Sequence, residues 1–83
     1  MLKCHKKEVK KMYKEVAKMR LKQIRTELGL SQYDVQTETG ISQSKISRFE
    51  TGEREPTIED LAKLSELYNV TTDWLLGIGK KDD

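Results

Sequence analysis

The chain has 83 residues, a net charge of +2 and one cysteine, with 36% charged and 35% hydrophobic residues. This length allows one domain with a small core, one cysteine excludes an intrachain disulfide, and no apolar run approaches the roughly 20 residues of a membrane-spanning helix. Charges stand at the N-terminus where a signal peptide needs an apolar stretch, so we expect a cytoplasmic protein without a membrane segment.

The charge is unevenly divided along the chain. Residues 1–25 contain ten Lys or Arg and two Glu, whereas the remaining residues contain six Lys or Arg and twelve Asp or Glu. A basic segment of this kind either forms a solvated helix face or lies beside a phosphate backbone. Both interpretations stay open at this point.

The first predicted helix covers residues 7–28, ends before Gly29 and carries two apolar stripes. One stripe faces the expected core and consists of Leu21, Ile24 and Leu28. The other has the 3–4–3 spacing of two heptads and consists of Val9, Met12, Val16 and Met19. This second stripe packs on its own domain near the last helix, pairs with a second subunit, or lies on anionic lipid, unless the segment is disordered.

A second and a third helix follow, separated by a three-residue turn. The second covers residues 32–39, with Ser31 as its N-cap and Asp34 as the capping-box partner. Gly40 tolerates the positive φ that a sharp turn favours. The third helix begins after Ser42 and ends at Gly52. This spacing is typical of a helix-turn-helix.

The third predicted helix has two different faces. Ile46 and Phe49 point toward a core, whereas Ser44, Arg48 and Thr51 project the other way, because each residue rotates the helix by about 100°. Side chains of Gln, Ser, Arg and Thr carry donors and acceptors that match base edges. The pattern therefore favours a helix that lies in a DNA major groove.

Two more helices complete the predicted fold. A fourth follows the N-cap Thr57 and ends near Asn69, and a short fifth covers about residues 72–76. The apolar residues expected to close the core, beyond those of the first helix, are Val35, Ile41, Ile46, Phe49, Leu61, Leu64, Leu67, Tyr68, Trp74 and Leu75. We predict an all-α domain of five helices with an N-terminally extended first helix: a basic amphipathic extension (1–16), the helix-turn-helix domain (17–77) and a flexible tail (78–83).

These features resemble the DNA-binding domain of the lambda-repressor and Cro family, also called the XRE family of bacterial and phage regulators. The resemblance covers about residues 17–77. It rests on Arg20-Leu21-Lys22-Gln23-Ile24-Arg25, Gly29-Leu30-Ser31-Gln32, Gly40-Ile41-Ser42, Ile46-Ser47, Phe49-Glu50-Thr51-Gly52, Pro56-Thr57, Leu61, Leu64 and Asp73-Trp74-Leu75-Leu76-Gly77. It implies a compact five-helix lambda-repressor-like fold, with double-stranded DNA as the partner and no cofactor. One position departs: Gln36 stands where the family usually has a small residue, so its side chain must escape sideways or bond across the helix pair.

The resemblance also implies roles for individual residues. The base-facing positions are Gln43, Ser44, Ser47 and Arg48. Of these we expect Gln43 to read adenine and Arg48 to read guanine, although a phosphate contact or a surface ion pair is the alternative for Arg48. The residues expected to meet phosphates are Gln32, Ser42, Lys45, Thr51 and Arg54. Arg25 and Glu50 match a buried ion pair between the first and third helices, and we interpret both as structural.

The predicted function is a sequence-specific DNA-binding transcriptional regulator, expected to be a repressor that binds an inverted-repeat operator as a homodimer. The residues expected at a dimer contact are Val9, Met12, Val16, Met19, Trp74, Leu75 and Leu76. The alternative is an antitoxin or another protein-interaction regulator that uses the extension as its partner site. We expect no enzyme, because no nucleophile–base set or phosphate-cradling loop occurs, and no metal site, because Cys4 and His5 are adjacent and alone.

Overall fold

A computed structural model describes the backbone of residues 6–78 and the side chains of residues 13–78. Within residues 6–78 the chain forms five helices and no strand: α1 (Lys6–Glu27), α2 (Gln32–Thr39), α3 (Gln43–Thr51), α4 (Ile58–Tyr68) and α5 (Thr72–Leu75). The predicted all-α class and the five helices are confirmed. Cys4 and His5, together with residues 79–83 of the predicted tail, lie outside the described part of the chain.

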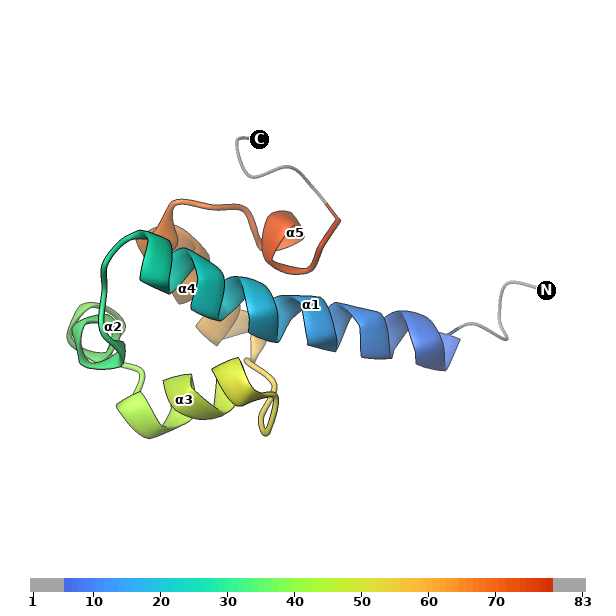
Figure 1. Ribbon diagram of the computed structural model, residues 1–83, viewed down its shortest axis with the longest axis horizontal. Helices are drawn as coiled ribbons and strands as arrows, with labels where there is room; N and C mark the ends of the chain where they lie inside the picture. The colour runs from blue at the N-terminus through green and yellow to red at the C-terminus, as the bar shows by residue number, and fades with distance from the viewer. Residues whose placement is uncertain (1–5, 79–83) are drawn as a thin grey trace.

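The helices are arranged around α1, which crosses the whole molecule (Figure 1). In this view α3 runs along one side of α1, α5 lies on the other side, and α2 is seen nearly end-on beside the C-terminal end of α1. The N-terminal turns of α1 extend beyond the other helices. The helix-turn-helix therefore occupies one end of the molecule, and the extension leaves from the opposite end.

The core lies where all five helices meet. Its buried residues are Leu21, Ile24, Val35, Ile41, Ile46, Phe49, Leu64, Tyr68, Val70, Trp74 and Leu75, and the partly buried residues packed against them are Leu30, Leu61 and Leu67. The prediction that Leu28 belongs to the core is wrong, since half of its side chain (50%) is exposed. The helix ends at Glu27, so Leu28 begins the turn to α2 and leaves the helical stripe that it was assigned to.

The hydrogen bonds at the helix ends confirm the capping residues predicted from the sequence. The Ser31 hydroxyl accepts from the Asp34 N–H at 2.9 Å, and the Asp34 carboxylate accepts from the Ser31 N–H at 2.8 Å. Gly40 adopts a φ of +80°, as expected for the turn between α2 and α3. Because these caps satisfy backbone groups that a helix leaves unpaired, they place the start of each helix and so the direction of α3.

The second apolar stripe of α1 is divided in the structure. Val16 is half-buried and lies against Gly77, just after α5. Met19 is 64% exposed. The side chains of Val9 and Met12 lie outside the described residues. The part of the stripe at Val16 therefore packs on its own domain, which was one of the open alternatives, and Met19 leaves an apolar surface uncovered.

Candidate nucleic-acid interface

The recognition strip is the outward face of α3. On its inner side Ile46 and Phe49 are fully buried in the core. The four residues predicted to face bases share the other side, where Ser44 and Arg48 are exposed and Gln43 and Ser47 are half-buried. We call Gln43, Ser44, Ser47 and Arg48 the recognition strip. The structure brings all four together on one helix face, whose opposite face is anchored.

The first turn of α3 is held by the residues that precede it and by α2. Ser42 is the N-cap, and its hydroxyl accepts from the Lys45 N–H at 3.3 Å. The Gln36 side-chain oxygen accepts from the Gln43 N–H at 2.7 Å. This is the bond across the helix pair that the long side chain at position 36 suggested. It satisfies a backbone donor that would otherwise have no partner within α3, and it joins α2 to the first turn of α3.

The ion pair between α1 and α3 has the geometry of a bidentate fork. Arg25 Nε and Nη2 donate to the two carboxylate oxygens of Glu50 at 2.7 and 2.9 Å, and Arg25 Nη1 donates to the Leu30 carbonyl oxygen at 2.9 Å. Glu50 is only 9% exposed. The hydrogen bond to Glu50 raises the pKa of the Arg25 guanidinium further above its usual value. A charge that is buried this deeply requires such a partner.

A chain of hydrogen bonds leads from this ion pair to the recognition strip. The Gln32 side-chain nitrogen donates to Glu50 Oε1 at 3.1 Å, and the Gln43 side-chain nitrogen donates to the Gln32 oxygen at 2.7 Å. Sequence reasoning treated Gln32, Gln43 and Glu50 as separate sites and missed this connection. It orients the Gln43 amide while leaving its second hydrogen available, and adenine recognition by Gln uses an amide hydrogen and the carbonyl oxygen.

Tyr68 of α4 completes the surroundings of the ion pair. Its side chain is buried in the core, and burial together with the negative charge of Glu50 raises the pKa of the phenol well above its usual value. The phenol is therefore neutral over the physiological pH range. The interior near Arg25 and Glu50 thus contains one compensated ion pair and no further charge from Tyr68.

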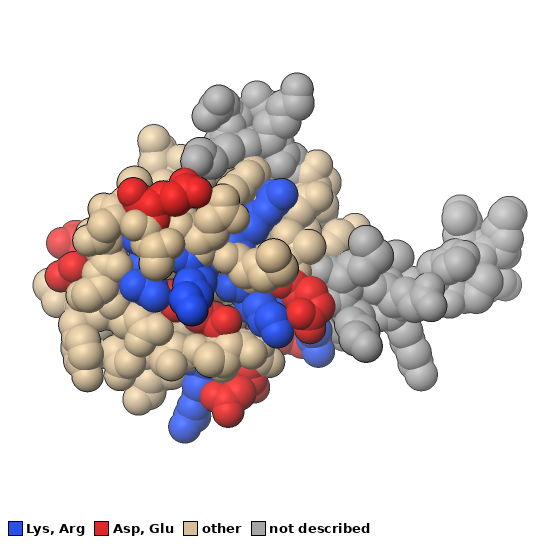
Figure 2. Space-filling view, in the orientation of Figure 1, with Lys and Arg blue, Asp and Glu red and all other residues tan. Residues whose placement is uncertain are grey.

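The cationic side chains differ in whether they already have partners. Among residues 13–78, the Lys and Arg side chains that form no ion pair or hydrogen bond within this part of the chain are Lys22, Arg48 and Arg54. Arg48 and Arg54 were predicted to contact DNA, whereas Lys22 was not. Lys22 lines an open groove between α1 and α3, together with Gln23, Thr26 and Glu50. Figure 2 shows Lys and Arg side chains, with Asp and Glu side chains among them, through the middle of the molecule, where α1 runs in the same orientation. Lys22 becomes a candidate phosphate contact because it has no carboxylate partner among residues 13–78. The sequence alone does not reveal this.

The remaining residues predicted to meet phosphates are partly engaged within the protein. Lys45 Nζ lies 3.8 Å from Asp60 Oδ2 of α4. The Thr51 hydroxyl donates to the Arg48 carbonyl oxygen at 3.2 Å and lies 3.3 Å from Glu53 Oε1. Gln32 uses its side chain for Glu50 and Gln43, but its backbone N–H stands in the first turn of α2, where helix N–H groups suit an anion. Their contacts with phosphate stay predictions.

Other kinds of site are not found in the described part of the chain. Residues 13–78 contain no group of three or more His, Cys, Asp or Glu side chains placed to hold a metal ion. None of the helices described is both long and apolar enough to cross a membrane.

The sequence profile of the family described as "Helix-turn-helix" matches residues 21–75. The chain is 39% identical over 67 residues to the HTH-type transcriptional regulator ImmR of Bacillus subtilis (strain 168), a match that covers 77% of this chain and 53% of that protein. It is 40% identical over 57 residues to the SPbeta prophage-derived uncharacterized HTH-type transcriptional regulator YonR of the same strain, covering 69% of this chain and 53% of that protein. The chain spans about half the length of these curated relatives. No solved structure gives a significant match.

Proposed function

We propose that this chain, which belongs to the helix-turn-helix family of the lambda-repressor and Cro (XRE) type, is a sequence-specific DNA-binding transcriptional regulator. The observation that carries the proposal is the recognition strip, four polar residues on a helix whose opposite face is buried. Both relatives named above are themselves called transcriptional regulators. A helix of about 10–12 Å diameter fits the major groove of B-DNA, which is about 12 Å wide.

Base reading rests on two side chains of different chemistry. The Arg48 guanidinium is exposed and has no ion-pair partner among residues 13–78, so it is available to donate two hydrogen bonds to guanine O6 and N7. The Gln43 amide is oriented by Gln32 and suits adenine N6 and N7. Ser44 and Ser47 hydroxyls accept or donate and therefore specify little. Sequence preference is accordingly expected at the bases that face Gln43 and Arg48.

Phosphate contacts would hold α3 in the groove from both sides. Lys22 and Arg54 form no ion pair with a carboxylate of residues 13–78 that would have to break before they bind a phosphate. The Gln32 N–H adds a donor at the start of α2. Ser42, Lys45 and Thr51 are further candidates. Since each neutralised phosphate releases condensed counterions, affinity is expected to fall steeply with salt.

We further propose that the protein acts as a repressor and binds an inverted repeat as a dimer. Two copies related by a two-fold axis would place their α3 helices about 34 Å apart on one face of the duplex. Exposed Met19 and half-buried Leu76 offer apolar surface for a second copy, whereas Leu75 is 0% exposed and Trp74 is buried. Sedimentation equilibrium of the full chain with an inverted-repeat duplex tests this point. Two copies per duplex support it, and one copy per duplex contradicts it.

DNA binding itself is tested by fluorescence anisotropy with a labelled random-sequence duplex over a series of salt concentrations. The wild-type chain is expected to bind, with a logarithmic affinity that decreases linearly with the logarithm of salt concentration. A matched control is Lys63→Ala, which removes an exposed lysine of α4 and should change nothing. Absence of binding at low salt, or a loss with Lys63→Ala equal to that with Lys22→Ala, would refute the proposed interface.

A further inference from the structure

The part of α1 between Tyr13 and Arg20 lies before the segment that matches the family, yet it contacts two distant parts of the domain. Lys14 Nζ pairs with Glu55 Oε2 at 2.6 Å, and the Lys18 stem lies over Gly52, where an added Cβ would be 3.0 Å from Lys18 Cδ. Toward α5, Val16 lies against Gly77, and Arg20 donates to the Trp74 carbonyl oxygen while its guanidinium stands 4.7 Å from the Trp74 ring centre. This part of α1 is thus attached to the α3–α4 loop on one side and to the α5 region on the other.

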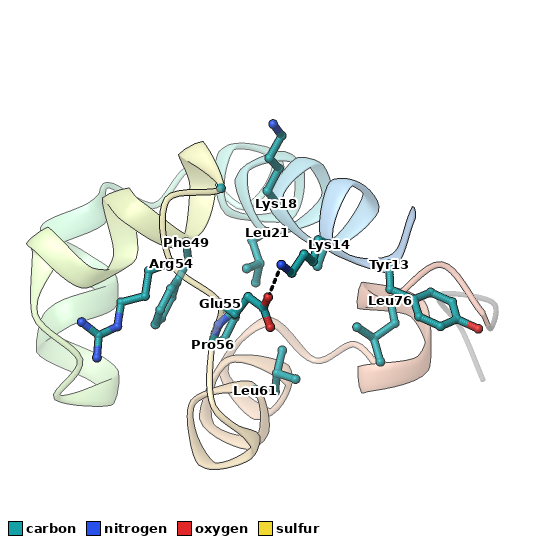
Figure 3. Close-up of a pocket in the computed structure, with 12 residues that line it drawn as sticks. Tyr13, Lys14, Lys18, Leu21, Phe49, Arg54, Glu55, Pro56, Leu61 and Leu76 are labelled. Atoms are coloured by element: carbon teal, nitrogen blue, oxygen red, sulfur yellow. Dashed lines mark ion pairs between the residues drawn. The ribbon is translucent and has the colours of Figure 1, made fainter. Parts of the chain in front are cut away.

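Two of these contacts reach the loop between α3 and α4. At its start the N–H groups of Gly52 and Arg54 both donate to the Arg48 carbonyl oxygen, at 3.0 and 3.3 Å. At its end Thr57 begins the capping box of α4. Glu55 lies between these fixed points, next to Arg54. Figure 3 shows the Lys14 and Glu55 side chains meeting between α1 and the loop, while Arg54 points away from α1.

An open pocket of about 170 Å³ lies between this loop and α1, lined on its apolar side by Ala17, Leu21, Phe49, Pro56, Leu61 and Leu76. Because of this pocket, fewer dispersion contacts join the loop to α1 than in a closely packed contact. Glu55, between the two fixed ends of the loop, is held toward α1 by the ion pair with Lys14, and the Lys18 stem covers Gly52.

We propose that Lys14 is a positioning residue for DNA binding, which through Glu55 holds the loop so that Arg54 reaches a phosphate. The inference rests on the proposed function and adds a role for residues that the family segment does not contain. An exposed ion pair contributes little to folding. However, a loop that is ordered before binding avoids the loss of conformational freedom that binding otherwise causes, an effect of about two- to tenfold in affinity for one side chain. The extension would thus strengthen DNA binding without touching DNA.

The variant Glu55→Gln separates this role from a simple electrostatic effect, because the two predict opposite changes in DNA affinity. If Glu55 were only a negative charge near the phosphates, removal of that charge would strengthen DNA binding. If Glu55 is the attachment point for Lys14, the same change weakens binding. Glu55 also makes a further interaction, so Lys14→Met is the more specific test of the ion pair and Glu55→Gln tests the loop attachment as a whole. The exchange of both charges, Lys14→Glu with Glu55→Lys, restores the pair and should restore affinity, which a direct phosphate contact by Lys14 would not allow.

The experiment measures affinity of the full chain for one duplex, with each variant made in the wild-type and in the Arg54→Ala background. We expect Glu55→Gln and Lys14→Met to weaken binding about two- to tenfold with an unchanged melting temperature, and to have no effect when Arg54 is already Ala. The matched control is the other exposed pair, Lys63 and Glu59 on α4, whose Lys63→Met and Glu59→Gln variants should bind normally.

Suppose that the wild-type chain binds DNA and that Arg54→Ala weakens this binding. Tighter binding by Glu55→Gln would then overturn the positioning role alone. An equal loss of affinity from Glu55→Gln in the wild-type and Arg54→Ala backgrounds would do the same. If the wild-type chain binds no duplex, the proposed function fails as well. Amide exchange of residues 53–55 in the free protein gives a second readout that needs no DNA. It should become faster in Glu55→Gln, and unchanged exchange would contradict the proposal.

Discussion

The substitution Glu50→Ala tests whether the bidentate ion pair holds α1 and α3 together. It removes the acceptor of three hydrogen bonds, two from Arg25 and one from Gln32. Removal of one partner of a buried ion pair costs about 3–5 kcal/mol, because the other charge stays buried without compensation. The Arg25 side chain is 12% exposed and keeps its bond to the Leu30 carbonyl oxygen. We therefore expect Glu50→Ala to lower the free energy of unfolding by about 3 kcal/mol, the lower end of this range.

For a domain of this size, about 1 kcal/mol corresponds to roughly 4–8 °C in melting temperature, so the expected decrease is roughly 12–24 °C. Circular dichroism of the helices, together with fluorescence of Trp74, measures it. Glu38→Ala is a matched control, since Glu38 is an exposed glutamate of α2, and it should change the free energy of unfolding by less than about 0.5 kcal/mol. Replacement of both partners, Arg25→Met with Glu50→Leu, should recover much of the loss because no buried charge remains. A decrease below about 4 °C for Glu50→Ala, which is about 1 kcal/mol, would show that the ion pair does not hold α1 and α3 together.

Three further predictions concern DNA contacts and pH. Arg48→Ala should cost about 1–3 kcal/mol on a specific site and relax preference at one base; equal weakening on every sequence would identify a phosphate contact instead. Lys22→Ala should weaken binding to all sequences alike and reduce the slope of the salt dependence by about 1, and an unchanged slope would exclude Lys22 from the interface. Because folding raises the pKa of Tyr68 above its unfolded value near 10, its contribution to stability is complete below that pH and decreases as pH rises further. Melting temperatures measured between about pH 9 and 11 should therefore fall more steeply for wild type than for Tyr68→Phe, and parallel curves would contradict this.

Features that depend on local chemistry were predictable from the sequence. Ser31, Ser42 and Thr57 stand at the starts of their helices, and Gly40 stands at the turn, because capping and positive φ select these residue types within a few positions. The two faces of α3 followed from helical periodicity in the same way. Leu28 shows the limit of that periodicity, since a stripe extended by one residue past the helix end assigns a turn residue to the core.

Features that depend on side chains from several helices were not predictable in detail. The hydrogen bonds that link Glu50 through Gln32 to Gln43 join α3 to α2 and back to α3. They depend on side-chain rotamers that only the assembled fold selects. The lack of a partner for Lys22, and the pairing of Lys14 with Glu55, likewise depend on where distant helices meet. The sequence placed Gln43, Ser44, Ser47 and Arg48 on one face of a helix, their contact with bases stays a prediction, and the structure adds the hydrogen bonds that orient Gln43.

In vitro selection of duplexes from a random pool by the full chain tests the central claim most directly. We expect an enriched inverted-repeat consensus, with half-sites about 34 Å apart and defined bases opposite Gln43 and Arg48. A pool that is bound but shows no enriched sequence would contradict sequence-specific recognition by α3.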